Sequence, residues 1–313
     1  MPIATQHTEI PAQGATPVSR EYVHKLDEAE VLLTSWRPVA PDMYVVTARW
    51  PRHHSFYAAR NGLHDPLLLA ESIRQAIPLL SHVAYDVPFG HRQSWSHFTY
   101  SLTPAALAAG DAPAEVELHI ACLDVIRRAG RLASMTMQIS IWRDGALLGT
   151  AQAGFLNLSP AIYQRTRGEY ADLDRSIANA VPLAPPMPPA RVAREEFADV
   201  VLSPTDTPNL SQLRVDLSHA VLFDHRVDHA PGMLLLEAAR QSAHAATFPR
   251  QTAVVGMETV FTRYAELDAP CWIQADPLPD DEAGRARVLV SALQNDICIF
   301  STVATLETVP ENR

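Results

Sequence analysis

The chain has 313 residues, about the length of two ordinary domains of roughly 150 residues each. Its 25 Lys and Arg residues against 35 Asp and Glu residues give a formal charge of −10, which excludes the generally basic surface of a nucleic-acid-binding protein. Hydrophobic residues make up 47% of the chain and charged residues 19%, so disorder is excluded as the dominant state. The three cysteines are far apart and form no CxxC pair, which fits a reducing cytoplasm and excludes a disulfide scaffold.

Residues 1–20 contain no apolar signal-peptide core and are expected to form a disordered tail. The chain also contains no stretch apolar enough to make a good membrane span. We therefore expect a cytoplasmic protein that binds neither membrane nor nucleic acid. No GxxxxGK[ST], GxGxxG or GxSxG motif lies in a fitting context, so we expect no nucleotide cofactor and no serine-hydrolase chemistry.

The first half begins with short strand-like segments at 31–36 and 44–50, followed by a long apolar helix predicted over 67–83. Pro78 lies inside this helix and should kink it or end its regular turns early. Segments rich in β-branched and aromatic residues then predict long antiparallel strands at 94–102, 115–125, 132–142 and 147–158.

The second half repeats this order around a second apolar helix, predicted over 232–247. Five prolines within residues 181–190 predict a stiff linker between the halves. The strands expected in the second half lie at 200–202, 213–217, 252–263, 270–275, 287–293 and 297–306.

This order predicts an α+β fold, a tandem (double) hotdog in which each half is an antiparallel sheet wrapped around a central apolar helix. The expected domains are an N-terminal hotdog domain over 21–175 and a C-terminal hotdog domain over 196–313, joined by a Pro-rich linker over 176–195. The two halves are expected to pack as the two protomers of a hotdog dimer do. The protein would then be a monomer acting as a pseudo-dimer, or a homodimer.

Both predicted helices carry a leucine run followed by a Glu-x-x-Arg-Gln motif. A histidine precedes each motif, His64 by seven residues and His229 by eight. Agreement in several landmarks at once predicts a duplicated domain. The motif residues are Glu71, Arg74 and Gln75 in the first copy, and Glu237, Arg240 and Gln241 in the second.

A glutamate and an arginine three residues apart share one helix face, and the simplest interpretation is an ion pair that only stabilises the helix. These pairs interrupt otherwise apolar helices, however, and ionised groups are rarely buried without a partner or a function. We therefore expect Glu237 and Glu71 to be catalytic, with Glu237 and Arg240 as the primary pair. Which glutamate is the base stays open, and either could instead orient its neighbouring arginine.

Further motifs follow one another along both halves: Val23-His24-Lys25, Trp50-Pro51-Arg52, His64-Asp65-Pro66 and Asp228-His229-Ala230-Pro231-Gly232. Together with the repeated Glu-x-x-Arg-Gln motif, they resemble the A-factor biosynthesis (AfsA-type) hotdog family, and the likeness covers both halves. The helix start at Pro231-Gly232 is separately similar to a segment of the β-hydroxyacyl-ACP dehydratases, but Phe223 stands where their catalytic histidine would lie.

The family resemblance implies an acyltransferase-type synthase without cofactor. It would move a β-ketoacyl group from acyl carrier protein to a hydroxyl of dihydroxyacetone phosphate. The resulting ester would lead to a γ-butyrolactone or furan-type signalling molecule that controls antibiotic production. The alternatives are a hotdog thioesterase or dehydratase acting on acyl-ACP or acyl-CoA, and a non-catalytic ligand-binding regulator.

Such a transfer needs a base, donors for the thioester oxyanion and a cation for the phosphate. Gly232 opens the second helix, whose first N–H groups could hold the oxyanion. Arg240 or Arg74 could bind the phosphate, with Gln241 and Gln75 beside them as further substrate contacts. His229 and His64 are expected at the mouth of the site, His229 as a proton shuttle. The repeated Asp-His pairs at 224–225 and 228–229 lie in an expected loop, so we expect no metal site.

Overall fold

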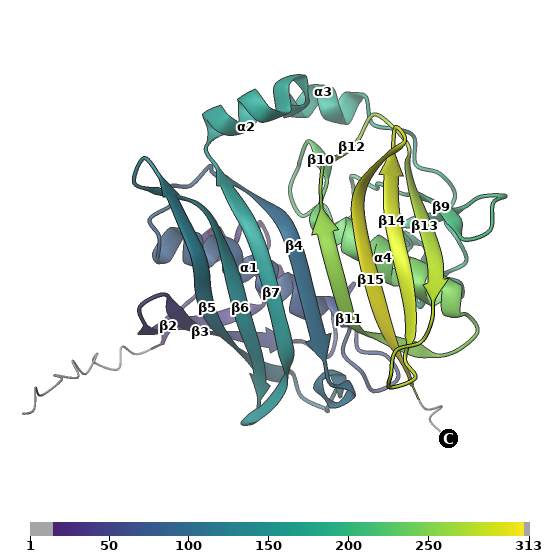
Figure 1. The fold of residues 1–313 in the computed structure, drawn as a ribbon, viewed down its shortest axis with the longest axis horizontal. Helices are drawn as coiled ribbons and strands as arrows, with labels where there is room; N and C mark the ends of the chain where they lie inside the picture. Colours follow the sequence, from purple (N-terminus) through teal and green to yellow (C-terminus); the bar gives the residue numbers. More distant parts are fainter. Residues whose placement is uncertain (1–14, 310–313) are drawn as a thin grey trace, which may run out of the picture.

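Two long helices, each packed against its own set of strands, organise the chain in the computed structural model, which describes residues 15–309 (Figure 1). They are α1 (Leu67–Val83) and α4 (Gly232–Thr247), and both have the bounds predicted from the sequence. Fifteen of the seventeen residues of α1 are buried. A helix that is apolar on nearly all sides is stable only when other elements surround it, so its sequence already required a covering sheet.

The first half contributes strands whose residues alternate between the core and the solvent. In β5, for example, alternate residues from Ala114 to Cys122 are buried while most of those between them are exposed. The strand order in this half is β1-β2-β3-β5-β6-β7-β4. The strands are β1 (Thr16–Pro17), β2 (Leu33–Ala40), β3 (Met43–Trp50), β4 (Arg92–Leu102), β5 (Ala114–Arg128), β6 (Arg131–Arg143) and β7 (Ala146–Leu158).

The second half continues the same sheet. Strand β4 pairs antiparallel with β11, so thirteen strands form one sheet in which the second half has the order β11-β15-β14-β13-β9-β8. Two short strands, β10 (His229–Ala230) and β12 (Ala265–Glu266), form a separate antiparallel pair. The sheet strands of this half are β8 (Leu202–Pro204), β9 (Leu210–Leu213), β11 (Thr252–Phe261), β13 (Cys271–Leu278), β14 (Ala286–Gln294) and β15 (Ile297–Thr308).

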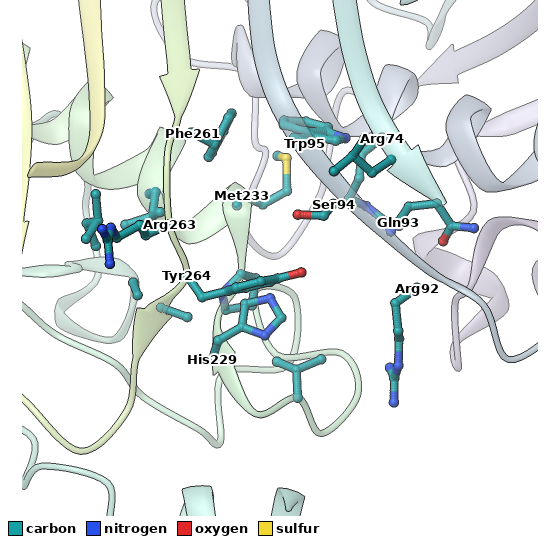
Figure 2. Close-up of a pocket in the computed structure, with 18 of the residues that line it drawn as sticks. Arg74, Arg92, Gln93, Ser94, Trp95, His229, Met233, Phe261, Arg263 and Tyr264 are labelled. Carbon is teal, nitrogen blue, oxygen red and sulfur yellow. The ribbon is translucent and has the colours of Figure 1, made fainter. Parts of the chain in front are cut away.

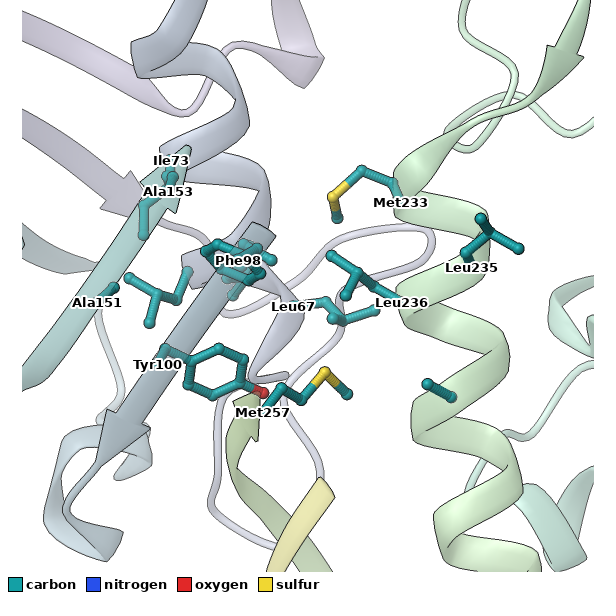
Figure 3. Close-up of a cluster of buried hydrophobic side chains, with 14 of the residues drawn as sticks. Leu67, Ile73, Phe98, Tyr100, Ala151, Ala153, Met233, Leu235, Leu236 and Met257 are labelled. Atoms are coloured by element: carbon teal, nitrogen blue, oxygen red, sulfur yellow. The ribbon is translucent and has the colours of Figure 1, made fainter. Parts of the chain in front are cut away.

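The halves share one hydrophobic core where α1 and α4 approach each other (Figure 3). Leu67 at the start of α1 lies near Leu236 of α4, and Tyr100 of β4 lies beside Met257 of β11. This common core fixes the two helices relative to each other. No helix among residues 15–309 has both the length and the apolar character needed to span a membrane.

Pro78 does not end α1 early, because the strands and α4 hold the helix on several sides and it continues to Val83; the kink that the sequence also allowed stays a prediction. Two further sequence expectations differ from the structure. The strands expected at 200–202 and 213–217 are displaced to β8 and β9, which form an edge hairpin, and the N–H of Val201 bonds to the side chain of Gln241 instead. Within the expected tail, residues 1–14 lie outside the described residues, while Thr16 and Pro17 pair with β2 as β1.

The connection between the halves contains helices that the sequence analysis did not anticipate. Helix α2 (Pro160–Arg167) follows β7 directly, and α3 (Leu173–Ala178) follows it across one end of the molecule (Figure 1). The domain boundaries at 175 and 196 stay predictions. Short 3₁₀ helices complete the elements: η1 (Arg20–Val23), η2 (Glu28–Glu30), η3 (Pro104–Leu107), η4 (Gly168–Ala171), η5 (Pro189–Val192) and η6 (Phe197–Asp199).

Candidate active site

Each Glu-x-x-Arg-Gln motif forms the same hydrogen-bonded unit on its helix. Arg74 Nε and Nη2 donate to the two carboxylate oxygens of Glu71 at 2.8 and 2.9 Å. Arg240 binds Glu237 with the same two nitrogens at the same two distances. The bidentate geometry is the strong form of an arginine–carboxylate pair, and it holds each arginine in one orientation.

The glutamine of each motif anchors the chain segment that leads into the sheet. Gln75 accepts a hydrogen bond from Leu32 N at 2.9 Å and donates to Glu30 O at 2.8 Å. Gln241 accepts a hydrogen bond from Val201 N and donates one to Asp199 O in the same way. Because both amide groups are committed to backbone, these glutamines position chain segments and do not reach an open cavity.

A second cation completes each unit, and the repeated motif did not predict it. Lys25 Nζ lies 3.2 Å from Glu71 Oε1, and Arg194 Nε lies 2.8 Å from Glu237 Oε1. Each follows a 3₁₀ helix and a residue in the left-handed conformation, with φ of 54° at His24 and 53° at Ala193. The repeated signal was present as a valine two residues before each cation and a valine–leucine run six residues after it.

The unit around Glu237 is the second unit and that around Glu71 the first; residues of the first half close the second unit. Arg194 Nη1 donates to Phe56 O at 2.7 Å and lies 3.2 Å from Asp65 Oδ2, and its guanidinium stacks 4.0 Å from the Phe56 ring. The Glu237 side chain is 0% exposed. Burial would raise its pKa, but Arg194 and Arg240 outweigh burial and lower it. Glu237 is therefore ionised and holds Arg194, which reaches Phe56 and Asp65 of the first half.

Matching local hydrogen bonds identify the residue of the second half that corresponds to Phe56. The Nδ1 atom of His54 accepts a hydrogen bond from Phe56 N at 3.1 Å, and that of His219 accepts one from Val221 N at 3.2 Å. Val221 therefore corresponds to Phe56. The Val221 side chain is smaller than the Phe56 ring that fills the second unit, and so it leaves space beside Lys25.

The Asp65 carboxylate, which closes the second unit, has no counterpart at the first unit. Asp65 and Ala230 each precede the proline that comes before a central helix, so Ala230 corresponds to Asp65. The second half thus has a methyl group at the position where the first half has the carboxylate that closes the second unit. Val221, Ala230, Lys25 and Glu71 accordingly line a cavity of about 830 Å³ between the halves.

This cavity has apolar walls and a polar end (Figure 2). Trp95 and Phe261 face each other across the join between β4 and β11, with ring centroids 5.5 Å apart, and Met233 lies beneath them. An apolar cavity with a few converging polar groups is the usual form of a small-molecule site. Further lining residues are Ile77, Pro78, Leu156, Leu158, Leu222, Leu235, Ile297 and Ile299.

Positive charge dominates the ionisable residues that line this cavity. Five lysine and arginine side chains line it against three carboxylates, in a chain whose net charge is −10. This excess favours anionic substrates. The cations are Lys25, Arg74, Arg92, Arg167 and Arg263, and the carboxylates are Glu71, Asp224 and Glu266.

Glu71 lines the cavity but is poorly suited to be a base. Burial opposes its ionisation, yet Arg74 and Lys25 lower its pKa to about 2. Its two oxygens already accept from Arg74 and Gln75. A carboxylate held in this way takes up a proton with difficulty, so Glu71 orients Arg74 and Lys25 at the cavity wall.

His229 has the geometry of a base. Its Nδ1 lies 2.6 Å from Asp228 Oδ1, and the side chain is 23% exposed on the cavity. Burial opposes ionisation of Asp228, but hydrogen bonds from His229 and Tyr163 lower its pKa to about 2. An ionised carboxylate at Nδ1 keeps the proton on that nitrogen and leaves Nε2 as the acceptor.

The start of α4 lies at the cavity. Gly232 and Met233 line the cavity, while the N–H groups of Leu234 and Leu235 bond to Pro231 O. The first N–H groups of a helix have no acceptor within the helix and carry its partial positive charge. The first residues of α4 and His229 thus line the same cavity.

The structure therefore separates the predicted site residues. Glu71, Arg74, His229 and Gly232 line the cavity, whereas Glu237, Arg240, Gln75, Gln241 and His64 do not. The preference for Glu237 and Arg240 as the primary pair does not fit this placement, because the closed unit fills the space that a substrate would need.

His64 also departs from its expected place at the mouth. It is 1% exposed, packs 5.8 Å from the Trp50 ring, and burial lowers its pKa to about 4. Neither ring nitrogen has a hydrogen-bond partner among residues 15–309. The described residues also contain no cluster of three or more His, Cys, Asp or Glu side chains that could hold a metal ion.

Solved structures of low sequence identity share this fold. The 12:0-ACP thioesterase from Umbellularia californica aligns with a TM-score of 0.54 at 8% identity, covering 85% of this chain and 94% of that one. An acyl-ACP thioesterase from Bacteroides thetaiotaomicron aligns with a TM-score of 0.50 at 12% identity, covering 84% of this chain and 98% of that one. At such identities the likeness establishes the hotdog fold alone.

Relatives of higher identity carry one enzyme name. The 2-oxo-3-(phosphooxy)propyl 3-oxoalkanoate synthase of Streptomyces virginiae is 46% identical over 91% of this chain and 95% of its own length. The enzyme of the same name from Streptomyces coelicolor is 39% identical over 93% of this chain and 91% of its own. A sequence model of the A-factor biosynthesis hotdog domain matches residues 6–159 and 176–310. The chain belongs to the A-factor biosynthesis hotdog family.

Proposed function

We propose that this chain is a 2-oxo-3-(phosphooxy)propyl 3-oxoalkanoate synthase, an acyltransferase that moves a 3-oxoacyl (β-ketoacyl) group from a thioester to dihydroxyacetone phosphate. The ester is the precursor of a γ-butyrolactone or furan-type signalling molecule. Relatives of this name match more than nine-tenths of the chain. The structural observation that carries the proposal is the Asp228–His229 pair beside the start of α4 in one cavity.

The reaction follows from this arrangement. The Nε2 atom of His229 takes the proton of the acceptor hydroxyl, and the hydroxyl oxygen attacks the thioester carbon. The N–H groups of Gly232 and Met233 hold the resulting oxyanion. When the C–S bond breaks, the imidazolium returns the proton to the thiolate, so the products are one ester and one free thiol.

The cavity also separates the two ends of the substrates. Trp95, Met233 and Phe261 offer apolar surface to the acyl chain. For the phosphate, Arg74 is oriented by Glu71 and Arg92 lies on the same side of the cavity (Figure 2). We assign the acyl donor to acyl carrier protein, whose acyl arm would enter between these walls. We also place the enzyme in the cytoplasm, because its three cysteines are free. We expect a monomer acting as a pseudo-dimer, or a homodimer.

The same geometry bears on the alternatives. A dehydratase would need a histidine in place of Phe223, which is buried here. A thioesterase would use His229 to activate water, and a regulator would bind the acyl group without turnover. A 3-oxoacyl-carrier thioester incubated with and without dihydroxyacetone phosphate separates these functions by mass spectrometry. We expect the phosphorylated ester only with the acceptor, whereas free 3-oxo acid at equal rates in both reactions would contradict the transferase.

The His229→Asn enzyme tests the assigned base in the same assay. Its rate of ester formation should fall about a hundredfold or more, since general-base catalysis contributes at least that much. The melting temperature should stay close to that of the unaltered protein, because the ring is partly exposed.

A further inference from the structure

Helix α2 belongs to neither hotdog sheet, yet it lies against the pair that we assign as the base. We propose that α2 is part of the active site, and that Tyr163 and Arg167 are positioning residues that fix the orientation and basicity of His229. The inference rests on the proposed function, in which His229 is the base.

Tyr163 binds the carboxylate that holds His229. Its hydroxyl donates to Asp228, 2.6 Å from Oδ1 and 2.8 Å from Oδ2. The same Oδ1 accepts from His229 Nδ1 at 2.6 Å. The Asp228 carboxylate thus accepts hydrogen bonds from both Tyr163 and His229. The Tyr163 hydroxyl draws away part of the negative charge that would otherwise act on the imidazole.

Arg167 braces the two short strands around the histidine. Its Nη2 donates to Glu266 Oε2 at 2.7 Å in β12, and its Nε lies 3.5 Å from Asp228 Oδ2. Its guanidinium also lies 4.2 Å from the centre of the Tyr264 ring. That ring in turn packs 4.6 Å from the His229 ring, edge to face. Arg167 therefore holds both the carboxylate and the aromatic wall of the base.

Both residues are buried for a reason other than core packing. Tyr163 is 8% exposed and Arg167 is 6% exposed, although α2 lies at one end of the molecule. Their polar atoms point to Asp228, Glu266 and the Tyr264 ring, all in the second half of the chain. Because α2 directly follows β7 of the first half, the connection carries the positioning groups from one half to the base of the other.

The test replaces Tyr163 by phenylalanine and measures kcat/KM against pH. Without the hydroxyl, more negative charge on Asp228 faces the imidazole and stabilises its protonated form. The acidic limb of the profile should move to higher pH by roughly half a unit or more, because charge-assisted hydrogen bonds shift pKa values on that scale. The ionisable groups that face or flank His229 are Asp228, Tyr163, Arg167, Arg263, Tyr264, Glu266 and, at the start of β4, Arg92.

Tyr85→Phe is a matched control. The Tyr85 hydroxyl donates to Asp42 Oδ1 at 2.6 Å; Tyr85 is buried, Asp42 is exposed, and neither residue lines the cavity. Both variants lose one short tyrosine–aspartate hydrogen bond, so both can lose stability, but only Tyr163→Phe should move the acidic limb. Equal profiles for Tyr163→Phe and the unaltered enzyme would overturn the inference.

A direct titration keeps the inference testable if Tyr163→Phe turns over too slowly. The imidazole resonance of His229, assigned by its loss in His229→Asn, should titrate at higher pH in Tyr163→Phe than in the unaltered protein. An unchanged titration would overturn the role of α2. Full activity in His229→Asn would instead refute the base itself, an outcome distinct from failure of the Tyr163 test.

Discussion

Glu71 and Glu237 show how two identical motifs take different roles. Each glutamate is bound by an arginine, a glutamine and a second cation. Asp65 and Phe56 close the space around Glu237 from the other half, whereas Ala230 and Val221 leave it open around Glu71. The residue types of a motif thus say little about whether a substrate can reach it. That access depends on the residues that face the motif from the other half.

Glu237→Gln is expected to lower stability and leave the chemistry intact. The substitution leaves Arg194 and Arg240 buried without their shared carboxylate, which costs about 3–5 kcal/mol of unfolding free energy. Urea unfolding measures this loss, and kcat should be retained by the protein that stays folded.

Glu71→Gln provides the comparison within the same motif. It should lower kcat/KM for the phosphorylated acceptor, since Arg74 and Lys25 lose their orientation at the cavity wall. A Glu237→Gln protein of unchanged stability but hundredfold lower kcat would contradict this division of roles.

The sequence identified the residue types of the site but not which copy is open. Glutamate, arginine and histidine could be chosen because they repeat in register within apolar segments. The exchanges of Asp65 for Ala230 and of Phe56 for Val221 could not be found this way, because their meaning depends on contacts between the two halves. Lys25 and Arg194 were within reach, since each follows a valine and precedes a similar apolar run.

At the scale of elements, Pro78 is the most unusual feature of α1. It has no N–H for the carbonyl of Arg74, yet the helix continues to Val83. Pro78→Ala restores this donor and should raise the free energy of unfolding by about 2 kcal/mol, partly offset by the greater freedom of the unfolded chain. Urea unfolding tests this, and a less stable Pro78→Ala protein would show that the ring contributes packing that outweighs the lost bond.

The helices differ in how readily the sequence predicts them. Helices α1 and α4 were predicted with their observed bounds, because long apolar segments between turn residues leave few other structures. Helix α2 was missed because it is short and mostly polar, with only Tyr163 and Arg167 buried. Its burial depends on Asp228 and Glu266, which come much later in the chain.

At the scale of the whole molecule, buried histidines should make folding sensitive to acid. Burial, with Arg240 nearby, lowers the pKa of His244 to about 3 from its ordinary 6.5. This histidine stays neutral in the folded chain but takes up a proton in the unfolded chain below pH 6.5. Its contribution to stability is complete above pH 6.5 and is lost as the pH falls toward 3.

His244→Gln should therefore flatten the acid dependence of stability. Between pH 7 and 4.5 the unaltered protein should lose about 2–3 kcal/mol more unfolding free energy than the variant, at about 1.4 kcal/mol for each unit below 6.5. Urea unfolding at the two pH values measures the difference. Equal losses in both proteins would mean that His244 is protonated in the folded state as well.

We expect the duplicated chain to hold one catalytic cavity, formed by the open unit, while the closed unit joins the halves. A 3-oxoalkyl thioether analogue of the donor has no thioester carbonyl and cannot transfer an acyl group, so it reports occupied sites without turnover. Native mass spectrometry, with calorimetry as a second measure, counts the analogue molecules bound to each chain at saturation. One bound molecule per chain, lost in a variant that fills the cavity such as Ala230→Trp, is the predicted result. Two bound molecules per chain, or one that Ala230→Trp leaves in place, would contradict it.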